Sequence, residues 1–150
     1  MLYALPLVYS LLAFCLLTCA FALWKGGLAE RLAAAAIVTS LVAGCLSWTL
    51  FESQVVDLAI DGVSALVLLV IALRFASPWL GAVMLVYAMQ FGLDAYYLVL
   101  ERPSANDKLH VAINNADTFA ISLCLAAGTV AAWRRRARSR PLDTALQAAP

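Results

Sequence analysis

The sequence has 150 residues, of which 65% are hydrophobic and only 13% are charged, and its formal net charge is +1. Soluble domains carry about 25% charged residues, so this composition excludes an ordinary soluble protein and indicates an integral membrane protein. Outside its apolar segments the chain has no room for a soluble catalytic domain of about 50 residues or more.

Hydropathy and helix breakers divide the chain into five apolar segments, each near the ~20 residues that a helix needs to cross a bilayer. Lys25-Gly26-Gly27 ends the first segment, Pro78 separates the third from the fourth, and the turn-forming run 102–107 precedes the fifth. The sequence therefore predicts an all-α, five-helix membrane domain over residues 1–133, with spans at about 2–24, 32–51, 55–75, 79–100 and 111–133. Residues 134–150 are expected to form a basic, disordered cytoplasmic tail.

The distribution of basic residues predicts the orientation of the chain. Eight of the ten Lys and Arg residues fall on one side of the five spans, and only Arg102 and Lys108 fall on the other. The positive-inside rule then predicts an N-terminus outside and a C-terminus in the cytoplasm, with Trp24, Trp79 and Trp133 at the inner interface. A multi-pass protein of this kind is expected in the bacterial inner (plasma) membrane.

Three aspartates, Asp61, Asp94 and Asp117, are predicted to lie at one depth in the membrane. Each is six residues from the outer end of its span, which is about 9 Å at ~1.5 Å per residue. An ionisable group inside a membrane is costly to keep there, and it marks a candidate functional site. Three carboxylates in one layer cannot all be ionised without a cation, protons or water between them.

Three of the predicted helices each carry a polar stripe, because polar residues three or four positions apart share one helix face. The predicted ligand- or ion-binding residues are Asp57 and Asp61 on the third span, Gln90, Asp94 and Tyr97 on the fourth, and Asn114 and Asp117 on the fifth. Because such stripes are costly in lipid, they are expected to converge on each other or on a partner protein.

Other residues give weaker signals. His110 is the only histidine and is expected to be a solvated loop residue, with a proton relay as the alternative. A lone histidine cannot supply a zinc or di-iron ligand set, so no metal site is predicted. The four cysteines fall within spans and are expected to be packing residues. The sequence has no phosphate-binding loop, nucleophile elbow or haem motif, so no cofactor and no nucleic-acid partner are predicted.

Two pairs of small residues, Ser40 with Gly44 and Ala88 with Gly92, have the spacing that lets membrane helices approach closely. They would serve either packing within the chain or a dimer seam. Five short helices form a thin bundle, so a homo-oligomer or a place in a larger membrane complex is expected.

The favoured function is the binding or transport of a cation or a proton-coupled small solute at an outward-facing acidic site. The first alternative is an accessory subunit that docks to a larger membrane complex through the same stripes. The second is an intramembrane enzyme in which one protonated aspartate donates a proton to a lipophilic substrate. The aspartates would otherwise only join helices by hydrogen bonds. Transport predicts a water path below the acidic layer, docking predicts stripes that face outward, and catalysis predicts a closed apolar pocket.

Overall fold

The computed structural model describes residues 4–50, 53–100 and 107–147, and within these ranges the chain is entirely helical apart from short connections. The helices are α1 (Ala4–Lys25), α2 (Leu28–Leu50), α3 (Gln54–Phe75), α4 (Pro78–Val99) and α5 (Lys108–Gln147). All five are long enough and apolar enough to cross a membrane. The structure thus confirms the all-α class and the five helices, as in a multi-pass membrane protein.

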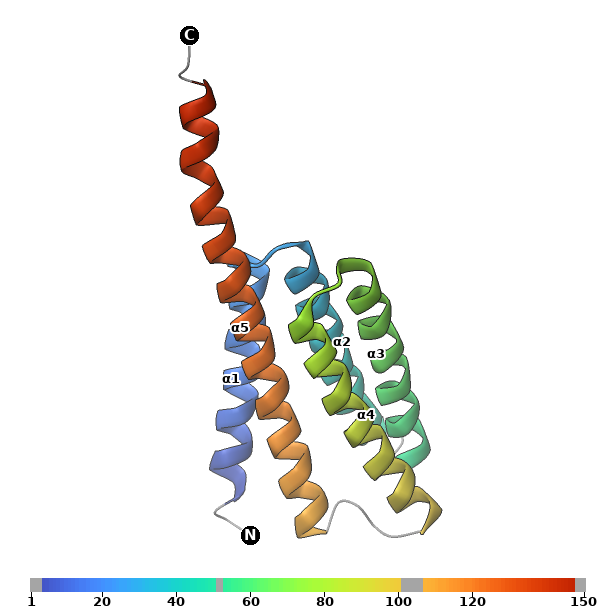
Figure 1. Ribbon diagram of the computed structural model, residues 1–150. Helices are drawn as coiled ribbons and strands as arrows, with labels where there is room; N and C mark the ends of the chain where they lie inside the picture. The colour runs from blue at the N-terminus through green and yellow to red at the C-terminus, as the bar shows by residue number, and fades with distance from the viewer. Residues whose placement is uncertain (1–3, 51–52, 101–106, 148–150) are drawn as a thin grey trace.

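The five helices form a single bundle, in which each helix packs antiparallel to the helices that precede and follow it in the chain (Figure 1). Helix α5 also packs against α1, so the order around the bundle closes from α1 through α5 back to α1. The two ends of the bundle differ in charge. We call one the acidic end, which carries Asp57, Asp94 and Asp107, and the other the arginine end, which carries Arg74 and residues 134–136.

The connection between α1 and α2 is only two glycines long. Helix α2 therefore begins at Leu28, earlier than residue 32, where the span was expected to begin. The Gly26 N–H donates to Ala22 O at 2.8 Å and closes α1. The Gly27 N–H donates to Oε2 of Glu30 at 2.9 Å, while the Arg31 N–H donates to Gly27 O at 3.0 Å. Glu30 thus caps the first turn of α2 in the manner of the acidic member of a capping box.

The connection between α3 and α4 is equally short. Ala76 adopts a left-handed conformation with φ 47°, and its N–H donates to Ala72 O at 2.9 Å, which ends α3. Pro78 then occupies the first turn of α4, where its missing N–H leaves no hydrogen bond unmade. Two such turns at the arginine end hold α1, α2, α3 and α4 in register.

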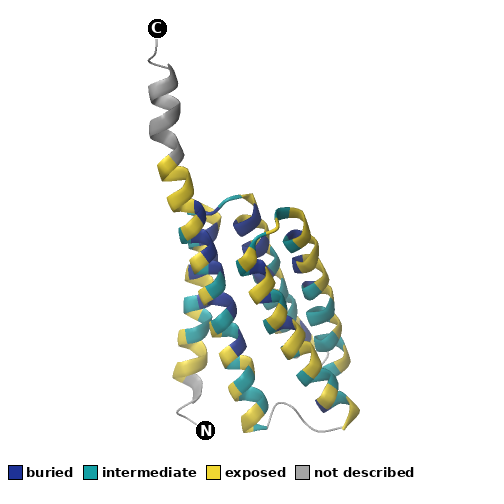
Figure 2. Ribbon diagram, viewed as in Figure 1, coloured by how far each residue is buried: buried dark blue, intermediate teal, exposed yellow. Residues whose placement is uncertain are grey.

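The core of the bundle lies toward the arginine end, where buried residues are concentrated (Figure 2). It is built largely from small and aliphatic side chains, among them Cys19, Ala22, Ala33, Ile37, Leu68, Leu80, Val83 and Leu125. Many large apolar side chains on the outer surface are exposed, such as Leu17, Leu73 and Val99. A soluble protein rarely exposes so much contiguous apolar surface, whereas a lipid-facing bundle requires it.

Helix α5 differs most from the sequence expectation. It begins at Lys108 rather than Val111, and it continues to Gln147, where a disordered tail was expected from Arg134 onward. Figure 1 shows this extension projecting beyond the other helices at the arginine end. Alanine and arginine are both strong helix formers, so the run 131–138 continues the helix with no breaker to stop it.

Three of the four small residues form no close helix contact within this chain. A Cβ added to Gly44 or Gly92 would meet nothing within 4 Å, and Ala88 and Gly92 are exposed. The close approach is elsewhere: the indole of Trp79 on α4 packs onto Gly128 of α5. The dimer seam stays a prediction.

Candidate functional site

Asp94 and His110 join α4 to α5 at the acidic end. Nε2 of His110 lies 2.7 Å from Oδ1 of Asp94, and the two side chains are only 15% and 19% exposed. A contact this short is a hydrogen bond in which Nε2 donates to the carboxylate when that nitrogen carries a proton. The expectation of a solvated loop histidine is wrong, because α5 begins early enough to place His110 in its first turn.

Asp107 and Tyr97 hold the His110 ring in place. Oδ1 of Asp107 accepts the Leu109 N–H at 2.8 Å, so Asp107 caps the start of α5. The Tyr97 hydroxyl donates to the other carboxylate oxygen, Oδ2, at 2.7 Å. The Tyr97 ring is buried and meets the His110 ring edge to face, with the centroids 5.0 Å apart. Tyr97 therefore contacts both Asp107 and His110 and helps to orient the His110 ring.

Asp61 brings the third helix, α3, to the same place. Its carboxyl group lies within hydrogen-bonding reach of Asp94, and Asp57, one turn away on the same face, is near enough for its charge to act on Asp61. Since an ionised carboxylate has no proton to donate, two carboxyl groups can hydrogen-bond only when one of them is protonated. Asp94 thus stands between a second carboxyl group and an imidazole.

Asp117 is the most buried of the predicted residues, at 2% exposed. Its Oδ2 atom has no hydrogen-bond partner among the described residues. It is near enough to Asp94 for their charges to interact, and it shares its helix face with Ile121 and Leu125, which are buried in the core. A buried carboxyl oxygen without a partner is costly, and it is a feature that functional sites retain.

Gln90 and Asn114 pair with each other on the surface instead of lining the site. Nε2 of Gln90 donates to Oδ1 of Asn114 at 3.2 Å, across the contact between α4 and α5. Asn114 is exposed whereas Asp117 is buried. The two residues of α5 therefore differ in burial although they lie on neighbouring parts of one helix face, because the 100° step per residue still separates positions three apart by about 60°.

Buried hydroxyl groups continue from the acidic end toward the arginine end. Ser64, Ser122 and Thr129 are buried, and each donates to a backbone carbonyl of its own helix at 2.7–2.8 Å. The Tyr87 side chain is also buried and lies near Ser40 of α2. Each hydroxyl oxygen keeps a lone pair with which it can accept a hydrogen bond from a neighbour or from water.

Sequence reasoning missed Asp107 and undervalued His110. A signal for both was present, because an aspartate followed three residues later by a histidine at the start of an apolar run is a helix N-terminus with the histidine in its first turn. Among the described residues, no group of three or more His, Cys, Asp and Glu side chains is arranged to hold a metal ion. Instead, the carboxyl groups of Asp61 and Asp94 and the imidazole of His110 follow one another in space. Such an arrangement suits the sharing and transfer of a proton.

The comparisons with known proteins give no match: no family model, no curated protein and no solved structure is similar to this chain.

Proposed function

We propose that this protein binds or transports a cation or a proton-coupled small solute at its acidic end, and that Asp61, Asp94 and His110 carry the exchangeable proton. The observation that carries the proposal is the contact of Asp94 with His110 on one side and Asp61 on the other. This arrangement brings together titratable groups from α3, α4 and α5, so that a change in protonation alters the forces between three helices.

The protonation state decides what the site can bind. With one proton shared between Asp61 and Asp94 and one more on His110, the site is close to neutral and has little attraction for a cation. Release of these protons leaves two carboxylates in contact, which repel each other unless a cation takes the place of the proton. Exchange of a proton for a cation follows from this competition, as in proton-coupled carriers.

The buried hydroxyl groups of Ser64, Tyr87, Ser122 and Thr129 support a path below the site. They supply polar positions at several depths between the acidic end and the arginine end, on three different helices. The buried carboxyl of Asp117 adds a further acceptor beside Asp94.

The proposal includes an orientation and a location. The acidic end faces outward and the arginine end faces the cytoplasm of a bacterial inner membrane, because basic residues concentrate on the cytoplasmic side of membrane proteins. In this orientation the site is reached from outside the cell.

A second candidate, an accessory subunit of a larger membrane complex or of a homo-oligomer, is favoured by one observation. The hydrogen-bonded amides of Gln90 and Asn114 lie at the surface between α4 and α5. Polar groups on a lipid-facing surface are stabilised by a partner helix that hydrogen-bonds to them.

The proposed function is tested with the purified protein in liposomes that enclose a pH-sensitive dye. A pH difference across the membrane should drive proton entry faster than in protein-free liposomes, and Asp94→Asn should reduce the protein-dependent rate at least about tenfold. Tyr96→Phe, which alters an exposed residue two positions away on the same helix, should keep the wild-type rate. Gradients of Na⁺ or tetramethylammonium, applied without a pH difference, then show whether a cation is exchanged for the proton.

Proton entry equal to that of protein-free liposomes, or an Asp94→Asn protein with the full wild-type rate, would contradict the proposal. Purification with a fixed stoichiometric partner, combined with no proton entry, would favour the accessory-subunit candidate.

A further inference from the structure

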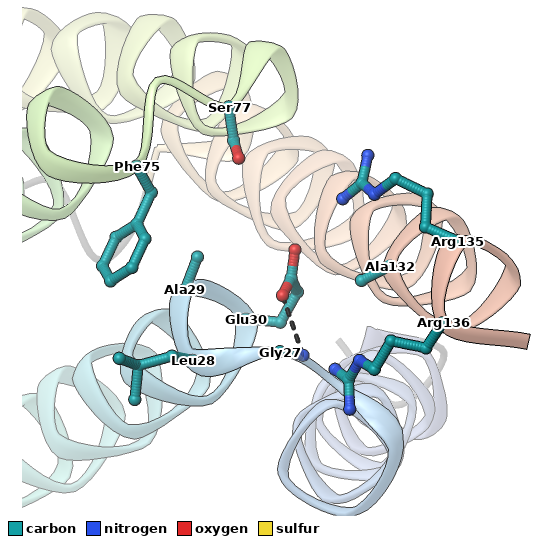
Figure 3. A pocket seen from close by; sticks show the side chains of 9 residues that line it. All are labelled: Gly27, Leu28, Ala29, Glu30, Phe75, Ser77, Ala132, Arg135 and Arg136. Carbon is teal, nitrogen blue, oxygen red and sulfur yellow. Dashed lines mark hydrogen bonds between the residues drawn. The ribbon is translucent and has the colours of Figure 1, made fainter. Parts of the chain in front are cut away.

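A second polar region lies at the arginine end, about as far from the acidic site as the bundle allows. A cavity of about 310 Å³ opens there between the start of α2, the connection from α3 to α4, and α5 (Figure 3). Its volume corresponds to about ten water molecules at ~30 Å³ each. Its charged or hydroxyl-bearing lining residues are Glu30, Ser77, Arg135 and Arg136.

Glu30 places a negative charge in this cavity. The residue is only 3% exposed, and its Oε2 accepts the Gly27 N–H at 2.9 Å. Figure 3 shows the carboxylate reaching into the space between the α3–α4 connection and α5. A buried carboxylate is stabilised by cationic or hydrogen-bonding groups around it.

Arg135 and Arg136 place positive charge beside Glu30. In Figure 3 their guanidinium groups lie on either side of the Glu30 carboxylate. Gly27 makes the approach possible, because a Cβ at that position would lie 2.6 Å from Oε2 of Glu30 and 3.3 Å from Nη2 of Arg136. Guanidinium groups present a fork of N–H donors that matches the oxygens of a phosphate group.

Ser77 adds a hydroxyl group on the opposite wall. It is the N-cap residue of α4, and its side chain makes no capping hydrogen bond, so the hydroxyl group is able to donate to a ligand. The two arginines and this hydroxyl group suit an anion, while Glu30 suits a cation.

The surroundings are those of a membrane interface. A second cavity of about 240 Å³ shares Arg136 with the first and is lined by Trp24, Lys25, Trp133 and Ala137. Trp24 and Trp133 are exposed, and tryptophan at the end of a span marks the level of lipid headgroups. Basic pockets between membrane helices at this level bind phosphate-bearing lipid headgroups.

From these observations we propose that the cavity binds the headgroup of an ethanolamine phospholipid, with the phosphate between Arg135 and Arg136 and the ammonium group at Glu30. This headgroup carries an anionic phosphate, which complements the arginines of the cavity, and a cationic ammonium group, which complements Glu30. A choline headgroup has no N–H to donate to Glu30, and a glycerol headgroup has no positive charge. The tryptophan-lined second cavity then receives the part of the lipid that leads to the acyl chains.

The test is native mass spectrometry of the purified protein in detergent, titrated with ethanolamine, choline and glycerol phospholipids that have identical acyl chains. The wild-type protein should bind the ethanolamine lipid about tenfold more tightly than the other two. Glu30→Gln keeps an oxygen that accepts the Gly27 N–H, so the fold is retained while the preference for ethanolamine should disappear. Arg135→Gln and Arg136→Gln should weaken binding of all three lipids by about tenfold. Arg134→Gln, an exposed neighbour that does not line the cavity, is the matched control and should bind as the wild type does.

Four outcomes would overturn the proposal. Equal binding of the three lipids by the wild-type protein, or an unchanged preference in Glu30→Gln, would remove the role of the carboxylate. Equal weakening by Arg134→Gln and Arg135→Gln would show general charge attraction rather than a site. Binding of O-phosphoethanolamine without acyl chains as tightly as the intact lipid would assign the cavity to a soluble ligand instead.

Discussion

His110 and Asp94 are 16 residues apart in the chain, yet their side chains meet at 2.7 Å across the contact between α4 and α5. The contact depends on two independent supports, the capping of α5 by Asp107 and the packing of the Tyr97 ring against the imidazole. Neighbouring groups that hold functional side chains in place in this way fix the geometry of a functional site.

The first prediction concerns the energy of this pair. In a double-mutant cycle of Asp94→Asn and His110→Phe, the two residues should show a coupling of about 1–3 kcal/mol in the free energy of unfolding, because a hydrogen bond with a charged partner has that magnitude. Unfolding in detergent with a denaturant series measures it. The control cycle of Tyr96→Phe with His110→Phe should be additive within about 0.5 kcal/mol. A coupling no larger than that control would show that the pair contributes nothing specific.

Asp117 is expected to lower the stability of the fold and to support proton transfer. Asp117→Leu replaces a buried carboxyl group that lacks a partner on one oxygen with a side chain that suits its neighbours Ile121 and Leu125, so it should stabilise the fold by about 1–3 kcal/mol. Proton entry into liposomes should fall at the same time. Ala116→Leu, at an exposed adjacent position, should change neither quantity. Loss of stability in Asp117→Leu would mean that the carboxyl group is satisfied in the folded protein.

The convergence of α3 and α4 at the acidic end is open to crosslinking. In a background with Cys15, Cys19, Cys45 and Cys124 replaced, the pair Asp61→Cys and Asp94→Cys should form an intramolecular disulfide under mild oxidation, because the two carboxyl groups are within hydrogen-bonding reach. The pair Val63→Cys and Leu85→Cys, at exposed positions on the same two helices, should not. Mobility on a non-reducing gel distinguishes the two results. Equal crosslinking of both pairs would place the helices differently from this arrangement.

Gly128 should be sensitive to a single added methyl group. A Cβ at this position would lie 2.7 Å from the Trp79 indole, so Gly128→Ala should destabilise the fold by about 1–3 kcal/mol through overpacking. Gly81→Ala, on the same helix as Trp79 but with nothing within 4 Å of the added Cβ, should be neutral or slightly stabilising. Thermal unfolding of both variants in one detergent compares them. A neutral Gly128→Ala would mean that the Trp79 ring moves freely.

The proposed orientation predicts where reporters are active. A reporter that is active only in the cytoplasm should work when fused after Pro150, and it should be inactive when inserted in the segment 102–106. A reporter that is active only outside the cell should give the reverse. The same result at both positions would mean that an even number of spans lies between them. It would therefore contradict the proposed topology of five spans, with the N-terminus outside and the C-terminus in the cytoplasm.

Much of the fold could be predicted from the sequence because a membrane imposes simple rules. Five apolar runs of about 20 residues, separated by glycines, a proline and a turn-forming run, predicted five helices close to those observed. Helix ends were less accurate, since α2 and α5 begin at caps formed by Glu30 and Asp107, and caps depend on single side chains.

The site could be predicted only in part. Counting residues from the span ends placed Asp61 and Asp94 at one depth, and the structure brings them together. Depth alone does not give rotation about the helix axis, which is why Asn114 was assigned to the face of Asp117 but lies on the surface with Gln90. The cavity at Glu30 was not predicted at all, because it is formed by the starts of α2 and α4 and by the part of α5 that was expected to be disordered.

Helix α5 reaches both polar regions. His110 lies at its start and Arg136 lies 26 residues later, about 39 Å away at 1.5 Å per residue. Because a continuous helix resists compression along its axis, a shift of the arginines toward or away from a bound headgroup moves His110 by a similar distance relative to Asp94. A hydrogen bond of 2.7 Å does not survive a displacement of even one ångström. The lipid composition of one leaflet would then act on a hydrogen bond at the opposite face of the membrane.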